Sequence, residues 1–290
     1  MGHSFEPPKR IYKDIVTDSG RWEHVVPRAG DIVVSTPPKS GTTWTQAIIG
    51  MLIADDPEAD LNIAALAPWV DSGVRDVAEL AALLEAQTGR RQVKTHTGLN
   101  GIPYWPEVRY VTVYRHPIDV HFSFRDHVAN MNPDFFDRFY PDDISEGFRK
   151  FLEGDHFDAV SLKMILTHYR ETLAREPREN LLRLHYMDMI RDPRAAVSRI
   201  AEFTGFDCAP PFLDAVTEAT RFDSMRANAH RFVPGAGKGL WRNEKDFFHA
   251  SGTRDWRDRL TADDLAAYDA RVDAVLTPEE RRWLEQGGTV

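Results

Sequence analysis

Cysteine is nearly absent from this chain, with Cys208 as the only one among 290 residues. One cysteine cannot form an intrachain disulfide, so the fold must be stable without one, as is usual in a reducing compartment. The sequence also lacks an apolar run of about 18 residues, the length that a membrane-spanning helix needs. Its N-terminus lacks the apolar segment of a secretory signal. We therefore expect a cytoplasmic protein without membrane insertion.

Basic charge is not in excess either. The chain has 36 Lys and Arg against 45 Asp and Glu, which gives a net charge of −9 at pH 7. Nucleic acids and anionic membranes are bound by basic surfaces, so we expect neither as a partner. A hydrophobic content of 42% is ordinary for a globular protein. Without repeats or linkers, the sequence predicts one domain over residues 1–290, with residues 1–30 as a leader packed on it.

What the chain does contain is a strand–loop–helix segment between residues 31 and 53. Residues 31–35 form a short apolar run rich in β-branched side chains, which predicts a buried strand. Residues 42–53 have the length and apolar spacing of a helix. Backbone N–H groups at a helix start, together with a lysine in the preceding loop, favour a bound anion. The anion-binding residues that we expect are Lys39, Ser40, Gly41, Thr42, Thr43 and Trp44.

This loop differs from the phosphate loop of P-loop NTPases. Lys39 precedes Gly41 rather than following it, and Pro37 and Pro38 stiffen the turn. On the residue types alone, an ordinary strand–helix turn with a solvated lysine stays open. A P-loop kinase is a second alternative, but it needs magnesium and an acid at a neighbouring strand end. The neighbouring strand instead leads into Arg115.

Two further strands end in residues suited to anion chemistry. Residues 91–96 predict a strand that ends in Lys94 and His96, and residues 109–114 predict a strand followed by Arg115. Ligands of open parallel sheets bind beyond the carboxyl ends of the strands, so these side chains should face the first loop. The planar guanidinium of Arg115 suits phosphate recognition. A helix starting at Pro117 and reaching about residue 128 would carry Ser123 two turns in.

The remaining patterns predict a three-layer α/β fold, P-loop-like, with a central parallel sheet of about four or five strands. Another strand is expected at residues 180–186, and helices at 77–85, 160–172 and 193–204. Capping patterns predict helices that start after Thr261 and Thr277. Residues 131–158 have no clear period and are expected to be an insertion over the site. Its aromatic residues are Phe135, Phe136, Phe139 and Tyr140. Two roles stay open for them: the apolar walls of an acceptor pocket, or a small satellite core.

The loop at residues 35–44 resembles, nearly letter for letter, the 5′-phosphosulfate loop of the cytosolic-type sulfotransferases. These enzymes use 3′-phosphoadenosine 5′-phosphosulfate (PAPS) as donor. Lys94 and His96 stand in a Lys-Thr-His string that resembles the family's, whose histidine is the catalytic base and whose lysine contacts the transferring sulfonate. Residues 115–123 resemble the family motif whose arginine and serine, here Arg115 and Ser123, hold the 3′-phosphate.

The resemblance covers roughly residues 25–265, and it weakens in the third family motif. It implies that Tyr186 lies near the adenosine and that Phe222 stacks on the adenine. Residues 232–260 correspond to the loop that closes on the donor. His249 and Ala250 stand where the family has a basic pair, a change that removes a charged donor worth about 1.5–3 kcal/mol. The candidate replacements are Arg254 and Lys238.

The resemblance implies a PAPS-dependent sulfotransferase that needs no metal, similar to a bacterial branch described as glycolipid sulfotransferases. His96 would be the base, Lys39 would stabilise the leaving phosphate, and Lys94 would offset charge on the sulfonate. The expected partner is a small hydroxyl acceptor, apolar or glycolipid-like, and the protein is a monomer or a homodimer. The alternative is a nucleotide-binding protein of the same fold that has lost turnover, which the altered third motif keeps open.

Overall fold

The central sheet is parallel and has the strand order β2-β1-β3-β4 in the part of the chain described by the structure, a computed structural model. That part comprises residues 5–133, 141–155, 160–249, 256 and 258–288. The strands are β1 (Ile32–Ser35), β2 (Gln92–Thr95), β3 (Arg109–Tyr114) and β4 (Leu181–His185). Each lies within one residue of its expected bounds, which confirms the predicted α/β class with a parallel sheet.

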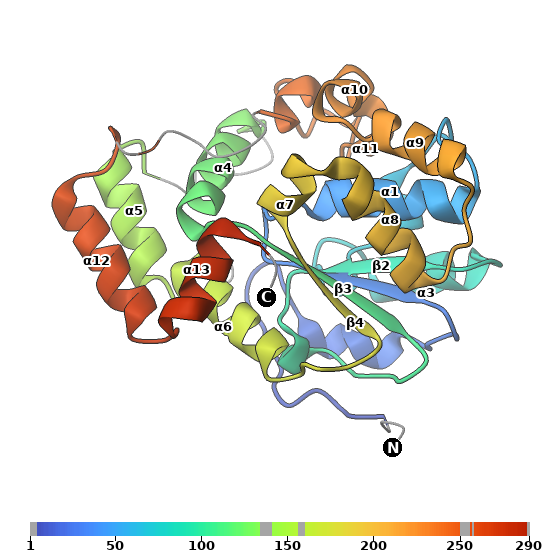
Figure 1. The fold of residues 1–290 in the computed structure, drawn as a ribbon, viewed down its shortest axis with the longest axis horizontal. Helices are drawn as coiled ribbons and strands as arrows, with labels where there is room; N and C mark the ends of the chain where they lie inside the picture. Colours follow the sequence, from blue (N-terminus) through green and yellow to red (C-terminus); the bar gives the residue numbers. More distant parts are fainter. Residues whose placement is uncertain (1–4, 134–140, 156–159, 250–255, 257, 289–290) are drawn as a thin grey trace.

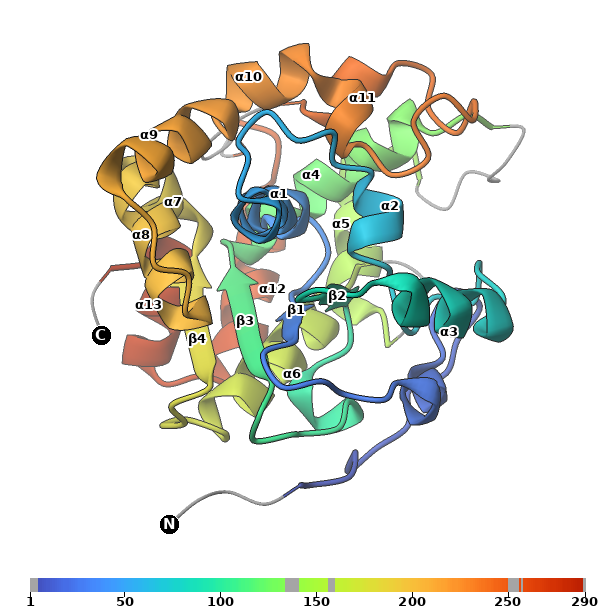
Figure 2. The same cartoon turned by 90° about the vertical axis from the view of Figure 1, so that its right-hand side faces the viewer.

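Three helices cover one face of this sheet. Ile32 and Val34 of β1 join Val111 and Val113 of β3 in one buried cluster, as the two-residue period of strands requires. The same cluster contains buried residues of α1 (Thr42–Ala54), α8 (Pro193–Thr204) and α9 (Pro210–Ala219). Figure 2 shows α1, α8 and α9 together on one side of the strands.

The opposite face is covered by the N-terminal segment and by α3 (Val77–Ala86). Val33 and Tyr110 alternate with the residues of the first face and pack in a cluster that includes Trp22, which is 1% exposed. Trp22 belongs to a 3₁₀ helix, η1 (Ser19–His24), capped by a side chain. A second short 3₁₀ helix, η2 (Leu99–Gly101), contributes Leu99 to the same cluster.

A separate core lies beyond the carboxyl end of β3, around the buried ring of Tyr114. Its helices are α4 (Pro117–Asn130), α5 (Ile144–Glu153), α6 (Leu162–Leu173), α12 (Ala262–Asp273) and α13 (Pro278–Gln286). Figure 1 shows α5 and α12 side by side, on the far side of α4 from α1 and α8. The capping boxes at Thr261 and Thr277 are present, which confirms both predicted helix starts.

Residues 131–158 have no period that predicts a helix, but the structure places α5 (Ile144–Glu153) within them. Phe148 and Phe151 of α5 are fully buried against α6 and α12. The aromatic residues singled out before it, within 134–140, lie outside the described residues. The remaining short elements are α2 (Ile63–Leu66), α7 (Tyr186–Arg191), α10 (Phe222–Ala227), α11 (Ala229–Phe232) and η3 (Glu244–Phe247).

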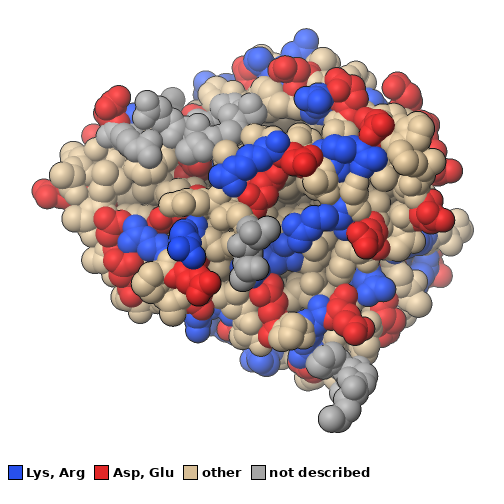
Figure 3. Space-filling model, in the orientation of Figure 1, with Lys and Arg blue, Asp and Glu red and all other residues tan. Residues whose placement is uncertain are grey.

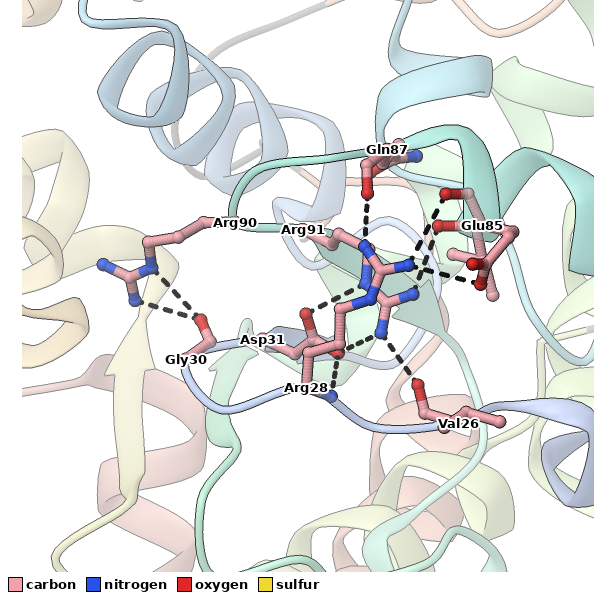
Figure 4. Close-up of polar contacts among 9 residues, drawn as sticks. Val26, Arg28, Gly30, Asp31, Glu85, Gln87, Arg90 and Arg91 are labelled. Atoms are coloured by element: carbon pink, nitrogen blue, oxygen red, sulfur yellow. Dashed lines mark hydrogen bonds and ion pairs between the residues drawn. The ribbon is translucent and has the colours of Figure 1, made fainter.

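A buried ion pair fixes the amino-terminal end of the sheet, opposite the carboxyl ends of the strands. Arg91 Nε donates to Asp31 Oδ1 at 3.1 Å, and Arg91 Nη2 donates to Asp31 Oδ2 at 2.5 Å (Figure 4). The same guanidinium donates to the carbonyl oxygens of Val26 and Leu84. One arginine therefore joins the residue before β1, the residue before β2, the N-terminal segment and α3.

Candidate active site

The topological switch point of the sheet lies between the carboxyl ends of β1 and β3. The chain leaves β1 toward β2 on one side and leaves β3 toward β4 on the other, so the connections diverge between these neighbours. Parallel sheets bind ligands at such a point. The loop with Lys39 follows β1, and Arg115 follows β3. A contact joins them, since Arg115 Nη1 donates to the Lys39 carbonyl at 3.5 Å.

Backbone conformation shapes the loop between β1 and α1. Lys39 has a φ of 63° and Gly41 has a φ of 109°, both in the region that L-residues rarely adopt. A Cβ atom at Gly41 would lie 3.1 Å from Cδ2 of Tyr186. The Tyr186 ring therefore lies directly on the loop, and a glycine is needed for both the conformation and the space.

The start of α1 has the properties of a phosphate or sulfate cradle. No side chain caps this helix, and its first turn holds no acidic residue. The first N–H groups of a helix have no partner within it. Ser40 is fully buried, and its hydroxyl finds no hydrogen-bond partner among the described residues. A hydroxyl and several N–H groups that converge without protein partners are suited to an anionic oxygen, so these groups fit a phosphate or a sulfate.

His96 is anchored to the same loop. Its Nδ1 lies 2.8 Å from the carbonyl oxygen of Thr36. A carbonyl only accepts, so Nδ1 carries the hydrogen and a neutral ring keeps its lone pair on Nε2. Burial, and then the charge of Lys94, lower the pKa of His96 to about 3. The imidazole is thus neutral near pH 7, with one nitrogen available as a base.

Lys94 and His96 are packed around one indole ring. The Lys94 ammonium lies 4.9 Å from the centroid of the Trp69 ring, and that ring contacts His96 edge-on at 4.9 Å. Burial lowers the pKa of Lys94 to about 8, and the charge of Asp71 opposes this shift. Asp71 itself is fully buried, accepts a hydrogen bond from the Thr95 hydroxyl, and has its pKa raised by burial. Trp69 thus contacts both Lys94 and His96.

The Lys39 side chain meets a residue that the sequence analysis did not single out. Its Nζ lies 2.9 Å from Nδ1 of His127 and 4.7 Å from the centroid of the Phe247 ring. The His127 ring in turn contacts Trp241 at 4.8 Å between centroids. Helical spacing in the sequence was the signal that points to His127, because it lies four residues after Ser123 and so on the same face of α4.

Arg115 lies against the aromatic residues of the candidate cofactor site. It is 3% exposed, and its guanidinium carbon lies 4.5 Å above the Tyr186 ring. Trp44 contacts the same ring edge-on at 5.8 Å. Tyr186 is the first residue of α7 rather than the end of a strand. The structure thus brings Arg115, Tyr186, Trp44 and the loop together.

The third motif is only partly described. Arg254 and Ala250 lie outside the described residues. His249 is exposed, with its Nε2 3.7 Å from Oδ2 of Asp126 on α4. Lys238 is exposed in a turn, and Phe222 is half-buried at the start of α10. The roles of Arg254, Phe222 and Ser123 in binding a nucleotide therefore remain predictions.

Within the described residues, no group of three His, Cys, Asp or Glu side chains is arranged to hold a metal ion. A helix with the length and apolarity to cross a membrane is likewise not found in the described part of the chain. Figure 3 shows acidic and basic side chains interspersed over one face of the molecule.

Comparison with known proteins identifies the family. The model of the sulfotransferase domain family matches residues 29–280. The chain therefore belongs to the sulfotransferase domain family, which confirms the resemblance seen in the sequence and the expected enzyme class. It is 28% identical to a glycolipid sulfotransferase of Mycobacterium bovis, over 96% of this chain and 94% of that protein. A glycolipid sulfotransferase of Mycobacterium tuberculosis H37Rv is also 28% identical, with the same coverage.

Solved structures share the fold. A retinol dehydratase in complex with retinol and PAP matches with a TM-score of 0.75 and 19% identity, over 90% of this chain and 87% of that one. A mouse sulfotransferase complexed with PAP matches with a TM-score of 0.74 and 20% identity, over 91% of each chain. At these identities the matches establish a common architecture.

Proposed function

We propose that this protein transfers a sulfonate group from PAPS to a hydroxyl group of a glycolipid-like acceptor. The observation that carries the proposal is the anchored imidazole of His96, neutral and with Nε2 available, beside a loop built to bind an anion. The names of the mycobacterial relatives support the acceptor class, and the PAP bound in two structures of the same fold supports the donor.

The residues at the switch point suit the donor's charges. The Ser40 hydroxyl and the first N–H groups of α1 would hold the 5′-phosphate, with the Lys39 ammonium beside them. Arg115 would hold the 3′-phosphate, because a buried guanidinium offers several N–H donors in one plane. Trp44 and Tyr186 supply aromatic surface next to it for the adenosine. When bound, the donor supplies an activated sulfonate and a phosphate leaving group.

In the reaction, the acceptor oxygen forms a bond to sulfur while the bond between sulfur and the phosphate oxygen breaks. His96 Nε2 takes the hydroxyl proton, as a neutral imidazole can. Lys39 and the N–H groups of α1 stabilise the charge left on the phosphate, and Lys94 offsets charge on the sulfonate oxygens. The residues assigned to PAPS include two lysines and an arginine. In this scheme, protein side chains therefore stabilise the negative charge.

The first test is titration calorimetry with PAP, with 5′-AMP and Mg–ATP as controls. The proposal expects PAP to bind without added metal and to bind more tightly than 5′-AMP, because Arg115 would contact the 3′-phosphate. Equal binding of PAP and 5′-AMP would mean that the changed third motif has removed the 3′-phosphate site. A preference for Mg–ATP would overturn the proposal in favour of a kinase.

The second test separates the enzyme from a binding protein without turnover, an alternative favoured by His249 in place of a basic residue. PAP release from PAPS would be measured with a panel of glycolipids, sterols and phenols as acceptors. Acceptor-dependent PAP release supports the enzyme. Tight PAP binding with no sulfonated product from any acceptor would support the binding protein.

A further inference from the structure

We propose that His127 is a positioning residue for Lys39, which belongs to the donor-binding loop (residues 36–41, between β1 and α1). The Lys39 ammonium donates a hydrogen bond to Nδ1 of His127, and this bond fixes its position. The two atoms lie 2.9 Å apart, although the residues are 88 positions apart in the sequence. Lys39 is on the loop after β1, and His127 is in the last turn of α4. The inference rests on the proposed function only in assigning Lys39 to the donor.

The hydrogen bond fixes the state of the His127 ring. An ammonium group only donates, so Nδ1 must accept and the neutral ring carries its hydrogen on Nε2. Burial, together with the nearby charges of Lys39 and Lys94, lowers the pKa of His127 and keeps the ring neutral. His127 and His96 therefore stand in opposite tautomers: His96 donates through Nδ1 to a carbonyl, whereas His127 accepts through Nδ1 from a cation.

A neutral partner suits the task of Lys39. A carboxylate at residue 127 would hold the ammonium more strongly, but its negative charge would offset the positive charge that an anionic donor needs and would repel the donor's phosphates. An imidazole lone pair satisfies one N–H of the ammonium without adding charge. His127 thus fixes the position of Lys39 while leaving its charge available to the ligand.

The His127 ring is itself held in place by aromatic side chains. It meets Trp241 at 4.8 Å and Phe247 at 5.5 Å between centroids, edge-on in both contacts. The Trp241 indole N–H donates to the Pro234 carbonyl at 2.8 Å, which fixes that ring as well. Phe247 also lies under the Lys39 ammonium at 4.7 Å. Residues 234–247 and the donor-binding loop are therefore connected through His127 and Lys39.

The test compares three substitutions at this position. His127→Asn retains an acceptor oxygen close to the position of Nδ1, His127→Gln moves it toward the position of Nε2, and His127→Phe keeps the ring contacts without an acceptor. The readout in the unliganded protein is the rate at which trace acetic anhydride acetylates Lys39, measured by mass spectrometry. The exposed Lys163 is the internal reference, and His230→Asn is the surface control.

We expect the Gln and Phe variants to acetylate Lys39 roughly 10-fold faster or more, as loss of a hydrogen bond to a charged group allows. The Asn variant should stay within about 3-fold of the native rate, since it restores the acceptor. Equal Lys39 rates in the native and Phe proteins, or an Asn variant as fast as the Phe variant, would overturn the proposal. If the Phe variant does not fold, the comparison of the Asn and Gln variants still tests the proposal.

Turnover gives an independent reading. His127→Phe should lower kcat by roughly 10- to 100-fold, the effect of one lost charged hydrogen bond. In a Lys39→Met background the same substitution should cause no further loss, because His127 acts through Lys39. An equal loss in both backgrounds would overturn the proposal. If the native protein shows no sulfonate transfer, the proposed function fails, while the acetylation result still decides the role of His127.

Discussion

The His96 imidazole and the Thr36 carbonyl are joined by a hydrogen bond of 2.8 Å between residues 60 positions apart. The Thr36 N–H in turn donates to the Thr95 carbonyl at 3.2 Å, next to His96 in the chain. The candidate base is thus hydrogen-bonded to the first residue after β1, while it follows β2 itself, so the sheet sets its position relative to the loop.

Substitution of His96 separates its two roles. His96→Asn keeps an N–H donor near the Thr36 carbonyl but has no basic nitrogen, whereas His96→Ala loses both. Removal of a general base costs about 10²–10⁴ in rate, so both variants should lose turnover to that extent. Only the Ala variant should also weaken PAP binding, because only there is the loop released. Near-native turnover in either variant, measured as PAP release, would show that His96 is not the base.

The rate should fall at alkaline pH because of Lys94. Its pKa is lowered from 10.5 to about 8, so Lys94 is a cation below pH 8 and loses its charge as the pH rises through that value. With Lys94 acting as a cation, kcat/KM should fall about tenfold per pH unit above pH 8. Because the pKa of His96 is about 3, neutral His96 imposes no acidic limb above about pH 5.

Lys94→Arg is the control for this pH profile. Arginine stays charged at every pH at which the protein is folded, so the alkaline fall should disappear even if the maximal rate is lower. A native profile that stays flat to pH 10 would contradict the assignment, as would an Arg variant with the native alkaline limb.

A methyl group at Gly41 should damage the donor site. Gly41→Ala forces an L-residue to a φ of 109° and places Cβ 3.1 Å from the Tyr186 ring. We expect a loss of stability of about 1–3 kcal/mol and PAP binding weaker by tenfold or more. Gly205→Ala is the matched control: its φ is 76°, with nothing within 4 Å of the new Cβ. It should cost about 1 kcal/mol and leave PAP binding unchanged, which urea unfolding and calorimetry would measure.

The buried pair of Arg91 and Asp31 should matter for stability and not for chemistry. Arg91→Met leaves the Asp31 carboxylate buried without its partner, and breaking such a pair costs about 3–5 kcal/mol of unfolding free energy. Arg28 and the exposed Glu85 form the comparison pair, since Glu85→Gln should cost less than about 1 kcal/mol. Urea unfolding measures both, and a smaller loss for Arg91→Met than for Glu85→Gln would contradict the argument.

The sheet and most of the donor loop could be predicted from the sequence because their signals are local. Strands buried on both faces appear as short apolar runs, and Pro37 and Gly41 mark where β1 ends and α1 begins. Lys94, His96 and Arg115 each follow or end such a run, and in a parallel sheet all carboxyl ends meet at one edge. Local order along the chain was therefore enough to bring these residues together.

Other parts depend on contacts between distant segments, which no local pattern records. The contact between His127 and Lys39 requires the end of α4 to lie over the loop after β1. Phe148 and Phe151 pack against α6 and α12, and this packing buries one face of α5. The sequence around α5 is rich in Phe, Tyr and Asp and shows no helical periodicity, so it did not predict this helix. The sequence pattern predicted a strand that ends at Tyr186. In the structure, Tyr186 is instead the first residue of α7, which follows β4 with no intervening loop.

The aromatic contacts of Lys39 also have a consequence for the order in which the site is assembled during synthesis. All four described strands, and the side chains of Lys39, Lys94, His96 and Arg115, are encoded before residue 186. Trp241 and Phe247, which flank His127 and Lys39, are translated more than fifty residues later. During synthesis, the strands and the loop with Lys39 are therefore made first, and Lys39 reaches its final surroundings only when the segment with Trp241 and Phe247 has emerged.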